Sequence, residues 1–299
     1  MKMKKTQLIL IALIGLVVLS SCKKDNDPEP ETMKSINLNL TGLEDLGADY
    51  VYEGWLIVNG SPISTGTFTV DDMGILSKTS FELAAMDVDD ATKFVLSVEP
   101  KMDTDPSPAA TKILAGDFSD SKAMLDISPV GDFMNAAGKY ILATPTNGAD
   151  TDENSGIWFL DLATGAPTVG LTLPQLSDGW VYEGWVVIDG MPVTTGRFTN
   201  VAATDESAPY SGSIPLPDVN GSNGFFPGED FLLNAPSGLT FPTDIAGGMA
   251  VISIEPSPDN SPGPFTLKPL VQPIPASAVD HTVYDMGQNL VFPSGTVTR

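Results

Sequence analysis

Hydrophobic residues occupy both sides of a predicted β-strand at residues 51–58. Tyr52, Leu56 and Val58 have the alternating spacing of a strand and fall on one side, whereas Trp55 falls on the other. Strands that are apolar on both sides are usually buried between two layers. We therefore expect this strand to be covered on both faces.

A β-hairpin is predicted over residues 51–69, because a turn dipeptide separates two strand-like runs. Asn59-Gly60 is typical of a type I′ turn, in which both central residues take positive φ. The run from Ile63 to Thr69 supplies the return strand. Pro62 cannot donate a ladder hydrogen bond, so we expect the return strand to lie at a sheet edge or to contain a bulge.

The same hairpin is encoded a second time at residues 181–199, where Asp189-Gly190 replaces the first turn dipeptide and Pro192 follows it. Counting back from the turns gives the predicted cross-strand pairs, which are Trp55 with Ser64, Glu53 with Gly66, Trp185 with Thr194 and Glu183 with Gly196. In this register each glycine lies diagonal to a tryptophan, within reach of the indole. We interpret Gly66 and Gly196 as packing residues that leave room for the ring.

A second block also recurs downstream of each hairpin. An apolar strand ends in Ser-Val-Glu-Pro at 97–100 and in Ser-Ile-Glu-Pro at 253–256, and an Asp- and Pro-rich loop follows each copy. Many short strands with frequent turn signals are typical of β-sandwiches. The fold class is predicted to be all-β, with two tandem antiparallel β-sandwich domains at 34–162 and 167–299. Residues 80–90 and 118–127 could each form a single helical turn.

The N-terminus has the pattern of an export signal. Three lysines precede an apolar run at 8–19, which is shorter than the roughly 20 residues that span a membrane. The run ends in Leu-Ser-Ser-Cys, which resembles the lipobox of bacterial lipoproteins and predicts lipidation of Cys22. We expect residues 1–21 to be a lipoprotein signal peptide and 22–33 a disordered, lipid-anchored tether. The protein would then lie in the bacterial cell envelope, at the outer membrane.

Charge and composition exclude several classes of function. The 38 acidic residues outnumber the 15 basic ones and give a net charge of −23, which disfavours binding to nucleic acid. The single cysteine and single histidine exclude an intrachain disulfide and a zinc site of Cys and His ligands. His281 lacks a nucleophile-elbow pattern to accompany it, so we expect a histidine at or near the surface.

The sequence leaves open a calcium-binding loop near residue 150. Asp150, Asp152 and Asn154 supply oxygen ligands at alternate positions, as calcium loops do, although the following glycine and acidic residue are misplaced. Residues 218–224 are a looser candidate. The alternative is a solvated acidic loop, and no other cofactor is expected.

The repeated motifs resemble the C-terminal domain of anti-sigma-K factors. The shared order is Tyr-Glu-x-Trp, Gly-x-Pro, Gly-x-Phe and then Glu-Pro with a Pro-rich loop. The matching residues are Tyr52, Glu53, Trp55, Gly60, Gly66, Phe68 and Glu99 in the first copy, and Tyr182, Glu183, Trp185, Gly190, Gly196, Phe198 and Glu255 in the second. The resemblance implies a domain that lies outside the cytoplasmic membrane. We expect no sigma-binding segment in this chain.

The motif carboxylates allow two interpretations. Glu53 and Glu183 could act as acid–base groups, paired with Glu99 or Glu255 as in glycoside hydrolysis. The family pattern also admits glutamine at the first of these positions, which favours a structural, hydrogen-bonding role. A non-enzymatic binding or sensing module for an envelope protein, peptide or glycan is therefore favoured over a glycan hydrolase or a passive spacer.

Replacing Cys22 with alanine tests the predicted anchor. The Cys22→Ala variant should lose fatty-acid labelling and move from the membrane fraction to the soluble fraction, because the thiol that carries the lipid is gone. Metabolic labelling with an alkyne fatty acid measures this, and Ser20→Ala serves as the matched control. Persistent labelling of the Cys22→Ala variant would contradict the prediction.

Overall fold

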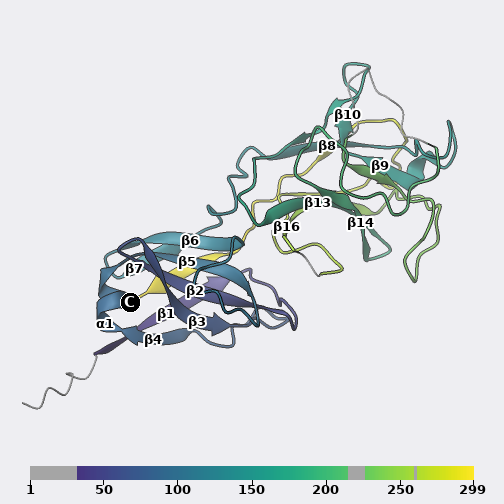
Figure 1. Cartoon of the computed structure of the whole chain (residues 1–299). Helices are drawn as coiled ribbons and strands as arrows, with labels where there is room; N and C mark the ends of the chain where they lie inside the picture. Colours follow the sequence, from purple (N-terminus) through teal and green to yellow (C-terminus); the bar gives the residue numbers. More distant parts are fainter. Residues whose placement is uncertain (1–31, 215–225, 259–260) are drawn as a thin grey trace, which may run out of the picture. The chain divides into compact units, whose positions relative to one another are not determined.

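The computed structural model describes residues 32–214, 226–258 and 261–299 (Figure 1). The predicted signal peptide, Cys22, most of the tether and the looser calcium candidate at 218–224 lie outside the described residues. Within them, Thr32–Arg299 group as one compact unit. The boundaries 34–162 and 167–299 of the two expected domains stay a prediction.

The all-β prediction is confirmed, and every strand pair among the described residues is antiparallel. The largest sheet has eight strands in the order β3-β2-β5-β6-β7-β19-β1-β4. Its strands are β1 (Met33–Thr41), β2 (Tyr50–Val58), β3 (Ser61–Phe68), β4 (Ser80–Ala84), β5 (Ala91–Pro100), β6 (Lys112–Ser119), β7 (Lys122–Leu125) and β19 (Ser294–Thr298). The sheet curves into a nearly closed barrel, because its edge strands meet where the Phe68 and Phe81 rings lie 6.3 Å apart.

The remaining strands form three smaller sheets. The second hairpin belongs to a four-stranded sheet of β14 (Met191–Phe198), β13 (Trp180–Ile188), β16 (Met249–Pro256) and β17 (Leu270–Pro273). A five-stranded sheet holds β12 (Leu171–Thr172), β8 (Ala137–Leu142), β9 (Gly156–Trp158), β15 (Gly228–Asp230) and β18 (Tyr284–Met286). The third pairs β10 (Leu160–Asp161) with β11 (Thr168–Val169), and a 3-10 turn, η1 (Glu153–Ser155), precedes β9.

The two expected helical turns have different outcomes. A short helix, α1 (Ala85–Asp90), forms in the second part of 80–90 and buries Val88. The prediction for 118–127 is wrong, because this segment is the β6–β7 hairpin. Ala123 and Leu125 alternate with exposed residues there, and Asp120 takes a φ of 56° in the turn.

The hairpin predictions are confirmed at the turn and at the tryptophan. Asn59 and Gly60 have φ of 51° and 80°, and Asp189 and Gly190 have φ of 51° and 83°, as type I′ turns require. Trp55 pairs with Ser64, and Trp185 with Thr194. The return strands β3 and β14 are sheet edges, as expected from Pro62 and Pro192.

Beyond the tryptophans the predicted register is wrong in both hairpins. A β-bulge inserts Thr65 and Thr195 between the paired positions, so that Glu53 faces Thr67 and Glu183 faces Arg197. Gly66 and Gly196 have φ of 104° and 109°, a conformation that side chains other than glycine's strain to adopt. These glycines serve the bulge and do not make room for the indole.

The C-terminal strand β19 lies inside the first sheet, between β1 and β7. In Figure 1 this yellow strand lies among the purple and blue strands of the N-terminal half. The final residue also binds to the first half of the chain. The Arg299 guanidinium donates hydrogen bonds to the carbonyl groups of Val88, Ala91 and Asp120 at 2.6–3.1 Å. The C-terminal strand β19 therefore joins β1 to β7 in the first sheet.

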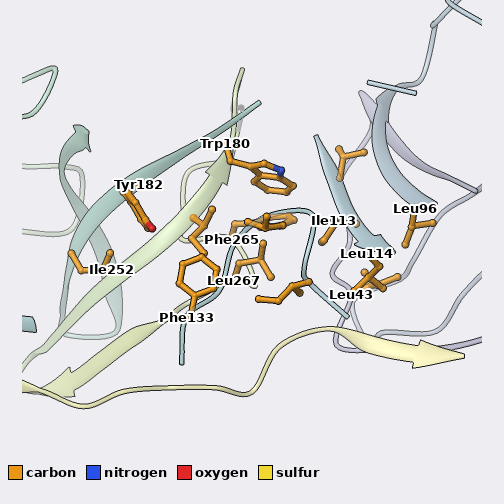
Figure 2. Close-up of a cluster of buried hydrophobic side chains, with 14 of the residues drawn as sticks. Leu43, Leu96, Ile113, Leu114, Phe133, Trp180, Tyr182, Ile252, Phe265 and Leu267 are labelled. Carbon is orange, nitrogen blue, oxygen red and sulfur yellow. The ribbon is translucent and has the colours of Figure 1, made fainter. Parts of the chain in front are cut away.

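One cluster of buried side chains includes residues from both halves of the chain. Figure 2 shows Leu43 and Ile113 of the first half, and Trp180 and Phe265 of the second, in this cluster. The rings of Trp180 and Phe265 lie 5.9 Å apart. Among the described residues, no helix is long and apolar enough to span a bilayer.

Replacing Gly295 with alanine tests the insertion of β19. The new Cβ would lie 2.2 Å from the backbone carbonyl oxygen of Asn39, so β1 and β19 must move apart. We expect the free energy of unfolding to fall by about 1–3 kcal/mol, the usual cost of overpacking. Urea unfolding measures it. Thr298→Ala, at an exposed position of the same strand, is the control, and equal midpoints for the two variants would contradict the insertion.

Candidate functional site

Three motif residues of the first half form a continuous series of hydrogen bonds on one face of β2 and β5. The Trp55 indole N–H donates to the Ser97 hydroxyl at 2.8 Å, and that hydroxyl donates to the Glu99 carboxylate. The backbone N–H of Ala109, in the Pro-rich loop, donates to the same carboxylate at 2.8 Å. The motif thus ties the loop to the sheet.

The second half contains the same bonds. The Trp185 indole donates to Ser253 at 2.8 Å, and Ser253 donates to Glu255. The backbone N–H of Phe265 donates to Glu255 at 3.0 Å, in the place that Ala109 takes in the first half. In both halves, the carboxylate of the Glu-Pro pair therefore accepts a backbone N–H of the loop that follows it.

The other two motif glutamates hold the bulge. Glu53 accepts a hydrogen bond from Ser64, and Glu183 accepts one from Thr194 at 2.5 Å. The hydroxyl of Ser64 in turn accepts from the N–H of Gly66 at 3.1 Å. Each carboxylate fixes the residue that precedes the bulge, and this fits the hydrogen-bonding interpretation.

The motif tyrosines attach each hairpin to the preceding loop. The Tyr52 hydroxyl donates to the Glu44 carbonyl at 3.0 Å, and the Tyr182 hydroxyl donates to the Pro174 carbonyl at 2.7 Å. Tyr52 also stacks on Phe68, with ring centroids 5.5 Å apart, and Tyr182 stacks on Phe198 at the same distance. Burial raises the pKa of both phenols, so they remain neutral donors.

Glu99 is a motif carboxylate with a raised pKa. Its side chain is fully buried, and the resulting desolvation raises its pKa, against the hydrogen bonds from Ser97 and Ala109 that lower it. A raised pKa in a cleft is one signature of an acid catalyst. Here the group lies inside the protein and is hydrogen-bonded by the fold, which favours a structural role.

The three residues of the first calcium candidate border the same pocket. Asp150, Asp152 and Asn154 border a cavity of about 460 Å³, and Asp244 and Asp280 reach it from distant parts of the chain. However, the described residues contain no group of three or more Asp, Glu, His or Cys side chains that could hold a metal ion. His281 is next to Asp280 in the chain, and its exposed ring lies 3.0 Å from the Asp280 carboxylate.

A cluster of buried acids in the second half was not predicted from the sequence. Glu229 and Asp230, on β15, are fully buried, and Asp205 lies beside them. Asp230 accepts bonds from the Thr146 N–H at 2.8 Å and from the Trp158 indole at 2.8 Å. Glu229 accepts one from Ser211, and Asp205 accepts one from the Gly228 N–H at 3.0 Å. No periodicity marks these acids as buried.

Burial changes the ionisation of this cluster. Desolvation raises the pKa of Asp205 to about 7 and that of Glu229 to about 7. The nearby Glu229 carboxylate adds to the shift of Asp205, and Asp230 adds to that of Glu229. Desolvation raises the pKa of Asp230 as well. Two members of the cluster, Asp205 and Glu229, therefore have pKa values close to neutral pH.

Comparison with known families supports the resemblance. Residues 29–113 match the family model described as anti-sigma-K factor rskA, C-terminal. This range includes the first hairpin, Ser97, Glu99 and Ala109, so this part of the chain is similar to the anti-sigma-K factor C-terminal domain. No curated protein and no solved structure matched the chain.

Replacing Ser97 with alanine tests the role of the motif. The change leaves the Trp55 indole N–H without its partner and removes a donor from the buried Glu99 carboxylate. We expect the free energy of unfolding to fall by about 1–3 kcal/mol, the usual penalty for a buried polar group left without a hydrogen-bond partner. Ser253→Ala should have a similar effect, and Ser80→Ala, at an exposed strand position, should have little. Chemical denaturation measures all three, and an unchanged midpoint for Ser97→Ala would refute the structural role.

Proposed function

We propose that this chain is a non-enzymatic binding or sensing module of the bacterial cell envelope. The observation that carries the proposal is the match of residues 29–113 to the anti-sigma-K factor C-terminal domain, a regulatory class of protein. The module would recognise an envelope protein, peptide or glycan and would have no contact with nucleic acid.

The hydrogen bonding of the motif supports a non-catalytic role. Glu53 and Glu99, the acids that glycoside chemistry would require, both accept bonds from the fold. Glutamine could accept the same bond at position 53 without an ionisable proton, whereas an acid–base catalyst needs the proton. The motif therefore serves to hold the hairpin, the bulge and the Pro-rich loop together.

The N-terminal sequence and the charge support the location and the kind of partner. A lipid on Cys22 would hold the module at the membrane surface, and a tether over 22–33 would let it reach a partner beside the bilayer. The net charge of −23 disfavours anionic lipid and phosphate surfaces and favours cationic or neutral ligands. We place the module at the outer membrane.

Crosslinking in cells, followed by affinity isolation of the full lipidated chain, tests the proposal. We expect one envelope component to be enriched and to be displaced by excess untagged protein, because recognition by a folded surface saturates. Glu53→Gln is the matched variant. It should retain the captured component and fold stably, because its amide oxygen can still accept from Ser64.

The same samples separate binding from catalysis. If the chain were a carboxylate-dependent hydrolase, Glu53→Gln or Glu99→Gln would abolish release of product from an envelope glycan preparation while leaving capture intact. That outcome, or failure to recover any component that competes, would refute the proposed function.

A further inference from the structure

The second half of the chain buries acidic groups that have no cationic partner. Glu229 and Asp230 are fully buried on β15, and Asp205 contacts the same strand through the Gly228 N–H at 3.0 Å. No salt bridge among the described residues involves any of the three. A buried carboxylate without a cation is unfavourable when charged, so such groups tend to bind a proton.

The charged neighbours of the cluster are nearly all acidic. Asp205 and Glu229 face one another, Asp230 faces Glu229, and Glu153 lies near Asp230. Glu183, on β13, acts on the nearby Tyr210 together with Glu229. Arg197, on β14, is the nearby cation, and it pairs with Glu206 at 3.8 Å. Ionisation of the cluster would therefore add mutual repulsion to the cost of burial.

A comparison of the two bulge glycines shows that this type of hairpin forms without an acid in the position of Asp205. In the first half, a Cβ on Gly66 would meet the Phe81 ring at 3.4 Å. In the second half, a Cβ on Gly196 would meet the Asp205 carboxyl carbon at 2.6 Å. An aromatic ring covers one bulge and a carboxyl group covers the other, so the same hairpin is stable under an apolar cover.

The segment 205–212 is attached to the rest of the second half in two ways. Backbone hydrogen bonds run from the Glu206 N–H to the Arg197 carbonyl and from the Leu232 and Leu233 N–H groups to the Tyr210 carbonyl, at 2.7–3.1 Å.

The buried acids supply the other set of contacts. Ser211 donates its hydroxyl to Glu229, and the Tyr210 N–H approaches the same carboxylate at 3.4 Å. The Gly212 N–H donates to Thr146 at 2.7 Å, and Thr146 in turn donates to Asp230 at 2.5 Å. A change in the charge of the cluster therefore acts directly on this second set of contacts.

We propose that Asp205 and Glu229 form a proton-dependent contact that holds segment 205–212 on the second sheet when protonated and loosens it when both carboxyls ionise. This inference rests on the proposed sensing function and gives it a regulation, in which the envelope pH sets the exposure of the segment. Each carboxyl releases its proton to water as the pH rises, and no other reactant is needed.

The raised pKa values of Asp205 and Glu229 determine the pH range over which the segment should loosen. Both acids have pKa values of about 7 in the folded protein, above their ordinary values. The stability that they contribute is therefore fully present below the ordinary pKa of an acid, near pH 4, and is lost as the pH rises towards 7. The segment should be held in acidic medium and loosened above neutral pH.

Hydrogen–deuterium exchange of the full chain tests the proposal, with the amides of Tyr210 and Gly212 as readout. After correction for the intrinsic pH dependence of exchange, the opening of these amides should rise by about tenfold or more between pH 5.5 and 8.5. Amides of β5 in the first half should show no such rise. The Asp205→Asn/Glu229→Gln double variant should reduce the change to less than about twofold, because it removes both titrating groups.

Asp72→Asn, at an exposed position in the first half, is the control and should behave like the wild type. Carboxyl ¹³C NMR of the wild type measures the two pKa values directly, so the proposal stays testable if the double variant does not fold. Values below about 5 for both groups, or an opening that is independent of pH, would overturn it. The exchange experiment needs no ligand, so its failure is separate from a failure to recover a partner.

Discussion

The register between β2 and β5, and the same register between β13 and β16, is the constraint on which the two halves depend. Glu53 pairs with Ser97 and Val51 with Glu99, so Glu53, Trp55, Ser97 and Glu99 all lie on one face of the two strands. A slip of one residue would move every one of these side chains to the opposite face and would bury an indole N–H and a carboxylate without partners. The serine of the Ser-x-Glu-Pro block satisfies both groups at once. The local sequence, the strand pairing and the hydrogen bonding of the buried polar groups therefore all specify the same β2–β5 register.

The opposite face of the same strands builds the main core. Tyr52 and Leu56 point into the large apolar cluster together with Phe94 and Leu96, and all four are fully buried. Each strand thus carries a polar, hydrogen-bonded face and an apolar face, and both are covered. In the first half, the Pro-rich loop is held in place by a hydrogen bond from the Ala109 N–H to the Glu99 carboxylate at the end of β5. Such a scaffold can vary its loops without losing its sheet.

The sequence predicted the elements that local chemistry determines. The turn dipeptides, the edge position of the proline strands and the tryptophan register all follow from a few neighbouring residues. The proline indicated an edge or a bulge, but the position of the bulge was missed. Thr65 and Gly66 fit a regular edge strand equally well, and the sequence does not show which glycines take a positive φ. Burial of Glu229 was missed because acids are rarely enclosed. Asp150 and Asp152 do border one pocket, but Asp244 and Asp280 also border it and come from distant parts of the chain, which local spacing could not predict.

The position of β19 could not be predicted, because its short run of residues 294–298 pairs with β1 across almost the whole chain. This arrangement imposes an order on folding. Synthesis proceeds from the N-terminus, so β1 and β7 are made before β19, and the first sheet keeps an open seam between these two strands until residues 294–298 are available. The emergence of this last strand is the event that closes the seam.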